Sequence, residues 1–510
     1  MTPEKKKILV EWILPEAAKL HSDRLLVKPL QSPIVVPTFR PENLCSKFTV
    51  PQEHKGKGVP EADIVLYAAA APTRLGTFAW AATCATLGRN GRPVVGIINY
   101  GPRYIVAIPQ RVRVAAHEIA HALGFSADVM DEKRMVESDE IYPGGPQQLY
   151  VVSPNTRRAA RKHFGCGSLE SVELDFNDFS GSVRSIMSGL HTNRTLLRTE
   201  MMLSRKPVNQ KLNGIDVVPA EESSSSFQGP QVVEKYKLPL ESMGYSSHWS
   251  RRIAKDELMV GLIGAGYYTA ITMGAFADLG YYKVEWAMAE QMSWGNNSGC
   301  GLLEKKCVEG GRTKFPDMFC TSKSTEGPAG LQCTSDRQSL GRCSIQTHRN
   351  PLPDHFQYFS DGKLGGNKAD LMDYCPIIVG KRETSCTDGE KSKMPGSVIA
   401  ANSRCVQGEN LKAKNAAVGA VCVEVSCKKN EVSVRYSGNN EWYSCPEGGR
   451  LAVQGTVLQG KIVCPKYADV CNTINRVIDK ERGRPMKLGA YVDHGNDGRS
   501  DGSVTAAILV

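Results

Sequence analysis

The cysteines constrain this chain more than any other feature of its sequence. There are 16 of them, an even number, and 13 lie between Cys300 and Cys471. No pair has the C-x2-C spacing of structural zinc sites, and the cysteine-rich part offers only His348 and His355 as further ligands. We therefore expect a disulfide framework. Because disulfide bonds persist in oxidising compartments, we expect the folded protein at a cell surface or outside the cell.

Length and composition indicate a folded protein with more than one domain. The 510 residues are enough for about two or three domains of ~100–200 residues each. A content of 41% hydrophobic and 23% charged residues is usual for a globular chain and excludes a mostly disordered or polytopic membrane protein. The net charge of +10 comes from short, scattered basic clusters such as Lys5-Lys6-Lys7, which do not indicate nucleic-acid binding.

We expect neither end of these 510 residues to carry a complete targeting signal. The apolar run 8–14 is interrupted by Glu11 and stopped by Pro15, which a secretory signal peptide would not tolerate. At the other end, small polar residues precede only the seven residues 504–510, fewer than the ~10–20 apolar residues of a glycolipid-anchor signal. We expect the chain to be a fragment or its gene assignment to be incomplete.

One internal segment has the length of a transmembrane helix. Residues 258–277 carry no charge over 20 positions. Four glycines and two adjacent tyrosines dilute its apolar character. We therefore predict a buried segment of a soluble core rather than a membrane span.

Hydrophobic periodicity predicts a mixed α and β fold. Apolar residues recur at helical spacing in 8–20 and 111–123, and a further helical piece is expected near 155–163. Residues 64–67 and 94–100 are β-branched runs bounded by turn formers. The two β-branched runs are predicted to be strands of one sheet.

The rest of the chain divides into a polar loop region and a β-rich C-terminal third. The serine tract in 221–226 is typical of a loop or linker. Valines alternate in 421–425 and, with a tyrosine, in 432–436, across the polar residues 428–430. This alternation predicts a hairpin in a β-rich, disulfide-stapled region.

The sharpest chemical motif is His117-Glu118-Ile119-Ala120-His121 in the predicted helix 111–123. Residues four apart lie on one helix face, so His117 and His121 can offer imidazole nitrogens to one metal ion. Glu118 projects beside them, where its carboxylate can take a proton from a metal-bound water. The continuation Ala122-Leu123-Gly124 matches the metzincin pattern H-E-x-x-H-x-x-G-x-x-H up to its glycine.

The third ligand of that pattern is missing at its usual position, which is Ala127, so it must come from further along the chain. The candidates are His163, His191 and His248. A methionine turn should follow the ligand, but a methionine stands eleven residues after both His191 and His248 (Met202 and Met259).

Sequence context favours His248 over His191. His191 precedes Asn193, which begins an N-glycosylation signal, as Asn296 does, and such signals indicate exposed surface. His248 instead precedes Met259 and the long uncharged segment, as a methionine turn followed by a core helix would.

The sequence resembles the leishmanolysin family of surface zinc metalloproteases, over almost the whole chain from about residue 8 to residue 471. The motifs that carry this resemblance are His117-Glu118-Ile119-Ala120-His121-Ala122-Leu123-Gly124-Phe125, Ser247-His248-Trp249, Asp256-Glu257-Leu258-Met259, Ala265-Gly266-Tyr267-Tyr268-Thr269, Trp294-Gly295-Asn296-Asn297-Ser298-Gly299-Cys300 and Met372-Asp373-Tyr374-Cys375-Pro376.

The resemblance implies an α+β, metzincin-type protease domain, with an insertion before the third histidine and a β-rich, disulfide-stapled C-terminal domain. It further implies one Zn²⁺ per chain, held by His117, His121 and His248, with Glu118 as general base and Met259 as the methionine turn. The family's cysteine order would pair all the cysteines, for instance Cys45 with Cys84 and Cys166 with Cys300. Family members are typically made as zymogens and are anchored by a glycolipid or released.

We expect four parts in the chain: a catalytic subdomain in 1–124, a central subdomain in 125–298, a cysteine-rich domain in 299–490 and a tail in 491–510. By the resemblance, we expect the signal peptide, the pro-segment and the first part of the N-terminal domain to be missing from these 510 residues. The insertion before His248 is longer than usual, by several tens of residues around the serine tract.

Two functions compete. The first is a zinc-dependent endopeptidase at the surface or secreted, with a role in adhesion and host infection, acting on protein and peptide substrates held along an edge strand. The strand 94–100 is our candidate for that edge. The alternative is a truncated, catalytically inactive homologue that acts as an adhesion or binding protein. The sequence leaves cleavage specificity, anchorage and oligomeric state open.

Overall fold

A computed structural model describes residues 1–140, 147–176, 231–235, 245–262, 264–428, 431–453, 455, 457–471, 490–492 and 506–509. The described residues within 1–176 and 231–510 form one compact unit. The serine tract, His191, Met202 and the glycosylation signal at Asn193 lie outside the described residues.

The helix predicted in 8–20 is confirmed as part of a longer helical segment. It runs through α1 (Pro3–Ile8), a single π-helical stretch (Leu9–Ile13) and α2 (Leu14–Ser22). Pro15 lies just after the π-helical stretch, and its missing N–H interrupts the hydrogen-bond ladder of the helical segment there. The segment buries its apolar face against the helix that carries the histidine motif.

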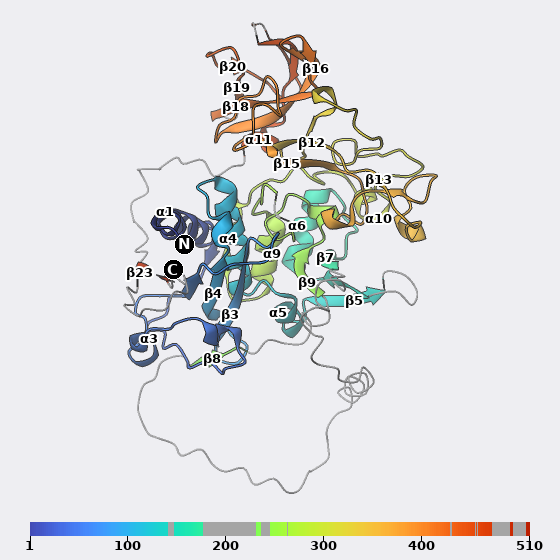
Figure 1. The fold of residues 1–510 in the computed structure, drawn as a ribbon. Coiled ribbons are helices and arrows are strands. Elements are labelled where there is room, and N and C mark those ends of the chain that lie inside the picture. Colours follow the sequence, from blue (N-terminus) through green and yellow to red (C-terminus); the bar gives the residue numbers. More distant parts are fainter. Residues whose placement is uncertain are drawn as a thin grey trace. The chain divides into compact units, whose positions relative to one another are not determined.

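A six-stranded sheet supports that helix. Its strand order is β23-β24-β2-β4-β3-β8, with β2 parallel and β3 antiparallel to β4. The strands are β2 (Val65–Ala69), β3 (Ala79–Leu87), β4 (Pro93–Tyr100), β8 (Val232–Glu234), β23 (Ala490–Val492) and β24 (Ala506–Leu509). Figure 1 shows β3 and β4 side by side, with the motif helix α4 next to them.

The prediction that 94–100 is an edge strand is wrong. Strand β4 lies between β2 and β3, and all of its residues are buried. An unbroken apolar run is typical of a strand that is covered on both faces, which is the physical reason for its central place. Strand β3 is the outer strand instead, because β8 pairs with it only over Ala85 to Leu87. Over 79–83, β3 has no second strand partner among the described residues.

The motif helix α4 (Pro109–Ala122) confirms the helix predicted in 111–123. It starts with a proline in its first turn and ends before Gly124, whose φ of 104° is open to glycine but strained for other residues. Gly96 of β4 lets α4 approach the sheet, because a Cβ there would come within 2.9 Å of the Ala122 Cβ atom.

The central part of the chain forms a second sheet and several helices. The antiparallel sheet has the order β5-β6-β7-β9, and His248 lies on β9. The elements are α5 (Ala127–Glu132), β5 (Val136–Glu140), β6 (Gln147–Val151), α6 (Pro154–Phe164), β7 (Val172–Phe176), β9 (Tyr245–Trp249), α8 (Arg251–Ala254) and α9 (Ala270–Asp278). Helix α6 confirms the prediction for 155–163.

The uncharged segment 258–277 is a loop followed by α9, and most of α9 is buried. None of the helices in the described ranges combines the length and apolar character that a membrane crossing requires. A single apolar cluster contains residues of α2, α4, α9 and the loop between β9 and α9, so the segment contributes to the same core as the motif helix.

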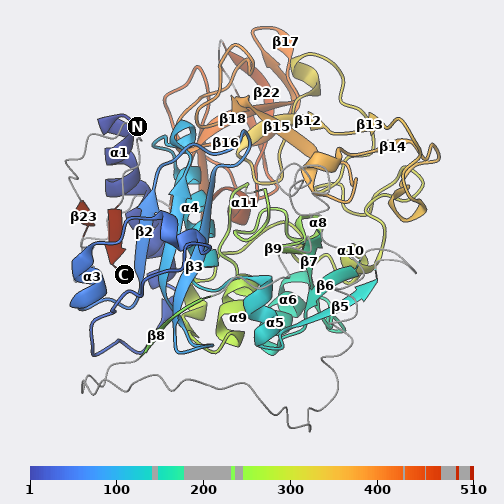
Figure 2. The same ribbon diagram turned by 60° about the horizontal axis from the view of Figure 1, so that its bottom comes forward.

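The C-terminal third is β-rich, as predicted. Its largest sheet has seven strands, visible around β16, β18 and β22 in Figure 2. The predicted hairpin is formed by β18 and β19, in which Val425 pairs with Val434. The strands of that sheet are β16 (Ser403–Ala413), β17 (Ala416–Ala417), β18 (Ala420–Lys428), β19 (Glu431–Arg435), β20 (Tyr443–Ser444), β21 (Arg450–Val453) and β22 (Leu458–Val463).

Shorter elements complete the described fold. They are β1 (Leu25–Leu26), α3 (Gln52–Gly56), β10 (Lys283–Val284), α10 (Gly301–Glu304), β11 (Gln332–Cys333), β12 (Ser339–Cys343), β13 (Gln346–Thr347), β14 (Leu364–Gly365), β15 (Ile378–Ser385) and α11 (Tyr467–Cys471).

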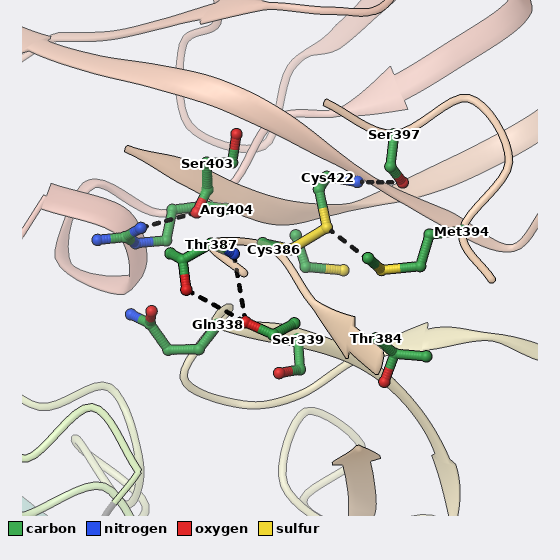
Figure 3. The surroundings of a disulfide bond; sticks show 12 residues. Gln338, Ser339, Thr384, Cys386, Thr387, Met394, Ser397, Ser403, Arg404 and Cys422 are labelled. Atoms are coloured by element: carbon green, nitrogen blue, oxygen red, sulfur yellow. Dashed lines mark hydrogen bonds between the residues drawn. A yellow bond between two sulfur atoms is a disulfide. The ribbon is translucent and has the colours of Figure 1, made fainter. Parts of the chain in front are cut away.

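All sixteen cysteines are paired in eight disulfide bonds, as the even count and the family resemblance implied. Cys45 pairs with Cys84 and Cys166 with Cys300. In the C-terminal third, Figure 3 shows the Cys386–Cys422 bond, where the Cys422 N–H donates to Ser397 Oγ at 3.0 Å. Disulfide bonds of this density are typical of proteins that fold in an oxidising compartment.

Candidate metal centre

Three histidine rings converge on one point. The Nε2 atom of His117 lies 3.1 Å from that of His121 and 3.1 Å from that of His248, and the third side of this triangle is 3.3 Å. The first two residues are one helical turn apart on α4, whereas His248 reaches the same point from β9. The structure therefore brings together the three histidines that the sequence analysis selected.

Hydrogen bonds to main-chain carbonyl groups determine which ring nitrogens carry protons. His117 Nδ1 lies 2.7 Å from the Leu258 carbonyl oxygen, and His121 Nδ1 lies 2.7 Å from that of Phe125. A carbonyl oxygen can only accept, so both Nδ1 atoms must donate. In the neutral rings, the Nε2 atoms of His117 and His121 are then unprotonated and direct their lone pairs at one another and at His248.

Burial keeps the rings of His117 and His248 neutral. Burial and, to a smaller extent, the neighbouring His121 together lower the pKa of His117 to about 3. Burial, with His117 and His121, also holds the pKa of His248 well below 6.5. Neutral imidazole is the form that binds a metal ion.

The three nitrogens fit a zinc ion. In a tetrahedral site with Zn–N distances of about 2.0–2.1 Å, ligand nitrogens are about 3.3 Å apart, close to the spacing of this triangle. Lone pairs of unprotonated nitrogens repel one another unless a cation lies between them. The donor set and the orienting carbonyl groups are those of a zinc site with three protein ligands.

Glu118 follows His117 on α4, in a dry environment that makes its carboxylate a stronger base than an exposed one. Its side chain is 9% exposed. Burial raises the pKa of its carboxyl group to about 8, while a hydrogen bond from the Ala81 N–H acts in the opposite direction by stabilising the carboxylate. Ala81 is on β3, so the outer strand of the sheet and the candidate base are in direct contact.

Met259 is fully buried in the loop between β9 and α9. Its carbonyl oxygen accepts a hydrogen bond of 2.8 Å from the Trp249 N–H, one residue after His248. The preceding residue, Leu258, supplies the carbonyl group that orients His117. The loop that contains Met259 therefore binds the ring of His117 directly and binds the backbone of Trp249, the residue after His248.

The remaining candidate, His163, lies elsewhere: its Nε2 atom is 2.9 Å from the Trp294 carbonyl oxygen. A second group of potential ligands in the described residues contains Cys166, Cys300 and Glu304, but its two sulfur atoms form a disulfide bond and bind no metal.

Sequence reasoning missed the backbone groups of the site. The Ala81 N–H and the carbonyl groups of Phe125 and Leu258 carry no side-chain signature, so a single sequence could not reveal them. Sequence reasoning also gave Glu257 no role, although a carboxylate two residues before Met259 and directly before the uncharged segment was a usable signal.

Comparison with known proteins gives one consistent result. The sequence profile of the family described as "Leishmanolysin" (Peptidase_M8) matches residues 1–209 and 240–477. The unmatched stretch between these ranges contains the serine tract, around which the sequence analysis expected extra residues.

Individual relatives agree with the profile. The chain is 33% identical to leishmanolysin of Leishmania major over 489 residues, which cover 92% of this chain and 69% of that protein. It is 32% identical to leishmanolysin of Leishmania tropica and 32% identical to a leishmanolysin homolog of Crithidia fasciculata, covering 92% and 93% of this chain. The chain spans 64% of the length of each of these last two proteins. With the profile match and these identities, the chain belongs to the leishmanolysin family.

Proposed function

We propose that this chain is a zinc-dependent endopeptidase that hydrolyses peptide bonds of proteins. His117, His121 and His248 are the proposed zinc ligands, Glu118 the general base and Met259 the methionine turn. The observation that carries the proposal is the triangle of three histidine Nε2 atoms, of which those of His117 and His121 are unprotonated, together with the buried carboxyl group of Glu118 on the same helix. Membership of the leishmanolysin family supports it.

Zinc bound at this triangle would lower the pKa of a coordinated water toward ~7 and polarise the scissile carbonyl group. Glu118 takes the proton that is released during attack, and its raised pKa makes it able to hold that proton and pass it to the leaving amine. The Ala81 N–H holds the carboxylate in place while it does so. A cation among the imidazoles would itself favour the ionised carboxylate, so it would draw the pKa of Glu118 down from about 8 towards neutrality.

The open edge of β3 is the proposed site for the substrate backbone. An extended peptide can add to an exposed edge strand through main-chain hydrogen bonds, largely independent of its sequence. Residues 79–83 provide such an edge directly beside Glu118, because Ala81 is within that stretch. This assignment replaces the strand 94–100, which is covered on both sides.

We propose a cell-surface or extracellular location, with extracellular and host proteins as substrates and a glycolipid anchor in the full-length form. The eight disulfide bonds and the family support the location. We also propose that the chain consists of a catalytic subdomain (1–124), a central subdomain (125–298), a cysteine-rich domain (299–490) and a tail (491–510).

The test is expression through an oxidising secretory pathway, followed by zinc analysis and digestion of a mixed peptide library. We expect one zinc per chain and cleavage that falls at least ~100-fold in Glu118→Ala with the zinc retained. Glu170→Ala, an exposed glutamate on the segment after α6, is the matched control and should cleave normally. Zinc binding without cleavage by the unaltered chain would contradict the proposal and favour the binding or adhesion function.

A further inference from the structure

The peptide group between Leu258 and Met259 makes two hydrogen bonds in opposite directions. Its carbonyl oxygen accepts from His117 Nδ1 at 2.7 Å. Its N–H, which belongs to Met259, donates to Glu257 Oε2 at 2.5 Å. Because the peptide group is planar and trans, its C=O and N–H point in opposite directions, so holding one end determines where the other points.

Glu257 is well suited to hold that end, because its own position is fixed from several sides. The side chain is fully buried. Its second oxygen, Oε1, accepts from Thr272 Oγ1 at 2.6 Å, from Thr269 Oγ1 at 3.0 Å and from the Thr269 N–H at 3.3 Å. Four donors therefore hold this carboxylate, three at Oε1 and one at Oε2.

The same hydrogen-bond network extends to Trp249, the residue that follows His248 on β9. Its Nε1–H donates to Thr272 Oγ1 at 2.9 Å. The Trp249 N–H donates to the Met259 carbonyl oxygen at 2.8 Å. Glu257 therefore joins the N-terminus of α9, the Met259 loop and the strand that carries His248.

We propose that Glu257 is a positioning residue of the metal centre, acting on His117 through the Leu258–Met259 peptide group. This inference rests on the proposed zinc site. Metal-binding histidines commonly donate their second ring proton to a carboxylate or a carbonyl group, which orients the ring and raises its basicity. Here a carboxylate and a carbonyl group act one after the other. The Glu257 carboxylate accepts from the Met259 N–H, and the Leu258 carbonyl group of the same peptide accepts from the His117 ring.

Two physical effects follow from this series arrangement. The ionised acceptor at the N–H polarises the peptide, which makes the Leu258 carbonyl oxygen a stronger acceptor for His117. The rigid peptide also transmits the position of Glu257 to the imidazole ring, which is needed for a triangle of nitrogens only 3.1–3.3 Å wide.

The test compares zinc affinity in Glu257→Gln and in the unaltered chain. A glutamine can still offer an oxygen to the two threonines, but its NH₂ group would then face the Met259 N–H, donor against donor. We expect zinc affinity, measured by competition with a chelator, to fall about tenfold or more. In the cobalt-substituted protein, we expect the visible absorption bands, which report the geometry of the ligands, to shift.

Glu290→Gln is the matched control. Glu290 is a partly buried glutamate with a side-chain exposure of 16%, and its Oε2 accepts from the Tyr268 N–H at 2.8 Å and pairs with Arg113 at 2.6 Å. Its loss removes a partly buried charge and a main-chain contact, but no hydrogen bond that ends on a histidine. We expect Glu290→Gln to lower the unfolding temperature while zinc affinity stays within twofold.

Equal zinc affinity in Glu257→Gln and the unaltered chain would overturn the inference, as would an equal loss in Glu257→Gln and Glu290→Gln. If Glu257→Gln yields no folded protein, Glu257→Asp replaces it. The shorter aspartate side chain keeps the negative charge, but its carboxylate no longer reaches the Met259 N–H. We therefore expect Glu257→Asp to bind zinc more weakly than Glu290→Gln does. Equal zinc affinity in these two variants would refute the positioning role of Glu257. Failure of the proposed function would instead appear as absent zinc or cleavage in the unaltered chain.

Discussion

The backbone N–H of Ala81 donates a hydrogen bond to the carboxylate of Glu118. This contact joins the outer strand β3 to the motif helix α4 at the residue proposed as the general base. Thr83, two residues further along β3, adds a second connection, because its Oγ1 donates to the Ala122 carbonyl oxygen at 3.0 Å. Strand and helix therefore run side by side through the site.

Replacing Ala81 with proline tests this contact. Proline removes the N–H that holds Glu118, and prolines are tolerated where a strand's N–H faces away from its neighbour strand. We expect the chain to fold and bind zinc, with kcat/KM for a peptide substrate lowered about 10- to 100-fold. The measurement is peptide hydrolysis together with zinc content.

Ala82→Pro is the control for that variant. In an extended strand, successive N–H groups point to opposite sides, so the Ala82 N–H faces β4, where Ala82 pairs with Ile97. We expect a loss of roughly 3 kcal/mol in the free energy of unfolding or no folded protein. Folded Ala81→Pro with full activity would show that the Ala81 contact does not support Glu118.

Removal of the metal should destabilise the fold through the three histidines. A ligand that binds only the folded state stabilises it by about 4 kcal/mol when its free concentration is 1,000 times Kd. We expect a chelator to lower the unfolding temperature of the unaltered chain but to have no effect on His248→Ala. His348→Ala, whose ring binds the Gly366 carbonyl oxygen at 3.0 Å, should respond to the chelator as the unaltered chain does.

The stability of the chain should depend on pH through His21. Its Nε2 lies 2.8 Å from the Ala116 carbonyl oxygen and its Nδ1 3.0 Å from the Tyr268 hydroxyl group. Burial lowers its pKa from 6.5 to about 4. Between these values the unfolded chain binds the proton and the folded chain does not, so the free energy of unfolding falls as the pH falls from about 6.5 to 4.

The size of that loss is about 3 kcal/mol, from a shift of roughly 2.5 units at ~1.4 kcal/mol per unit. Chemical denaturation at a series of pH values, on the unaltered chain and on His21→Gln, measures it. His21→Gln carries no titrating ring, so its stability should vary less across this window. Identical pH profiles of the two proteins would exclude His21 as the cause.

The Cys386–Cys422 bond should contribute strongly to the stability of the C-terminal third. It closes a sequence separation of 36 residues and lies within a buried cluster that includes Met394. From the entropy of loop closure we expect the double variant Cys386→Ala/Cys422→Ala to lose about 4 kcal/mol in the free energy of unfolding. Calorimetry under non-reducing conditions would reveal the loss, and an unchanged unfolding transition would contradict it.

The parts of the fold that sequence patterns predicted are those governed by local repetition. The motif helix was found because its apolar residues recur at helical spacing and a glycine, Gly124, ends it. The β18–β19 hairpin was found because valines alternate on both sides of a short polar stretch. His248 was chosen by its sequence context, with His191 as the alternative.

The position of each strand in the sheet was harder to predict. The strand 94–100 was recognised, yet its unbroken apolar run should have excluded it from an edge, since an edge strand is seldom covered on both faces. Strand β3 begins and continues with alanines and threonines, which give a weak strand signal. Contacts made by main-chain groups, such as the Ala81 N–H with Glu118, depend on tertiary packing and leave no pattern in the sequence.

The wide spacing of the three histidines along the chain affects the timing of metal capture. His248 follows His121 by 127 residues, whereas His117 and His121 are four residues apart. A ribosome therefore releases the first two proposed ligands long before the third, and the nascent chain has only a two-nitrogen site during that interval. Under the proposed function, tight metal retention requires a chain that has been synthesised past His248, because the strand that carries His248 must have joined the motif helix.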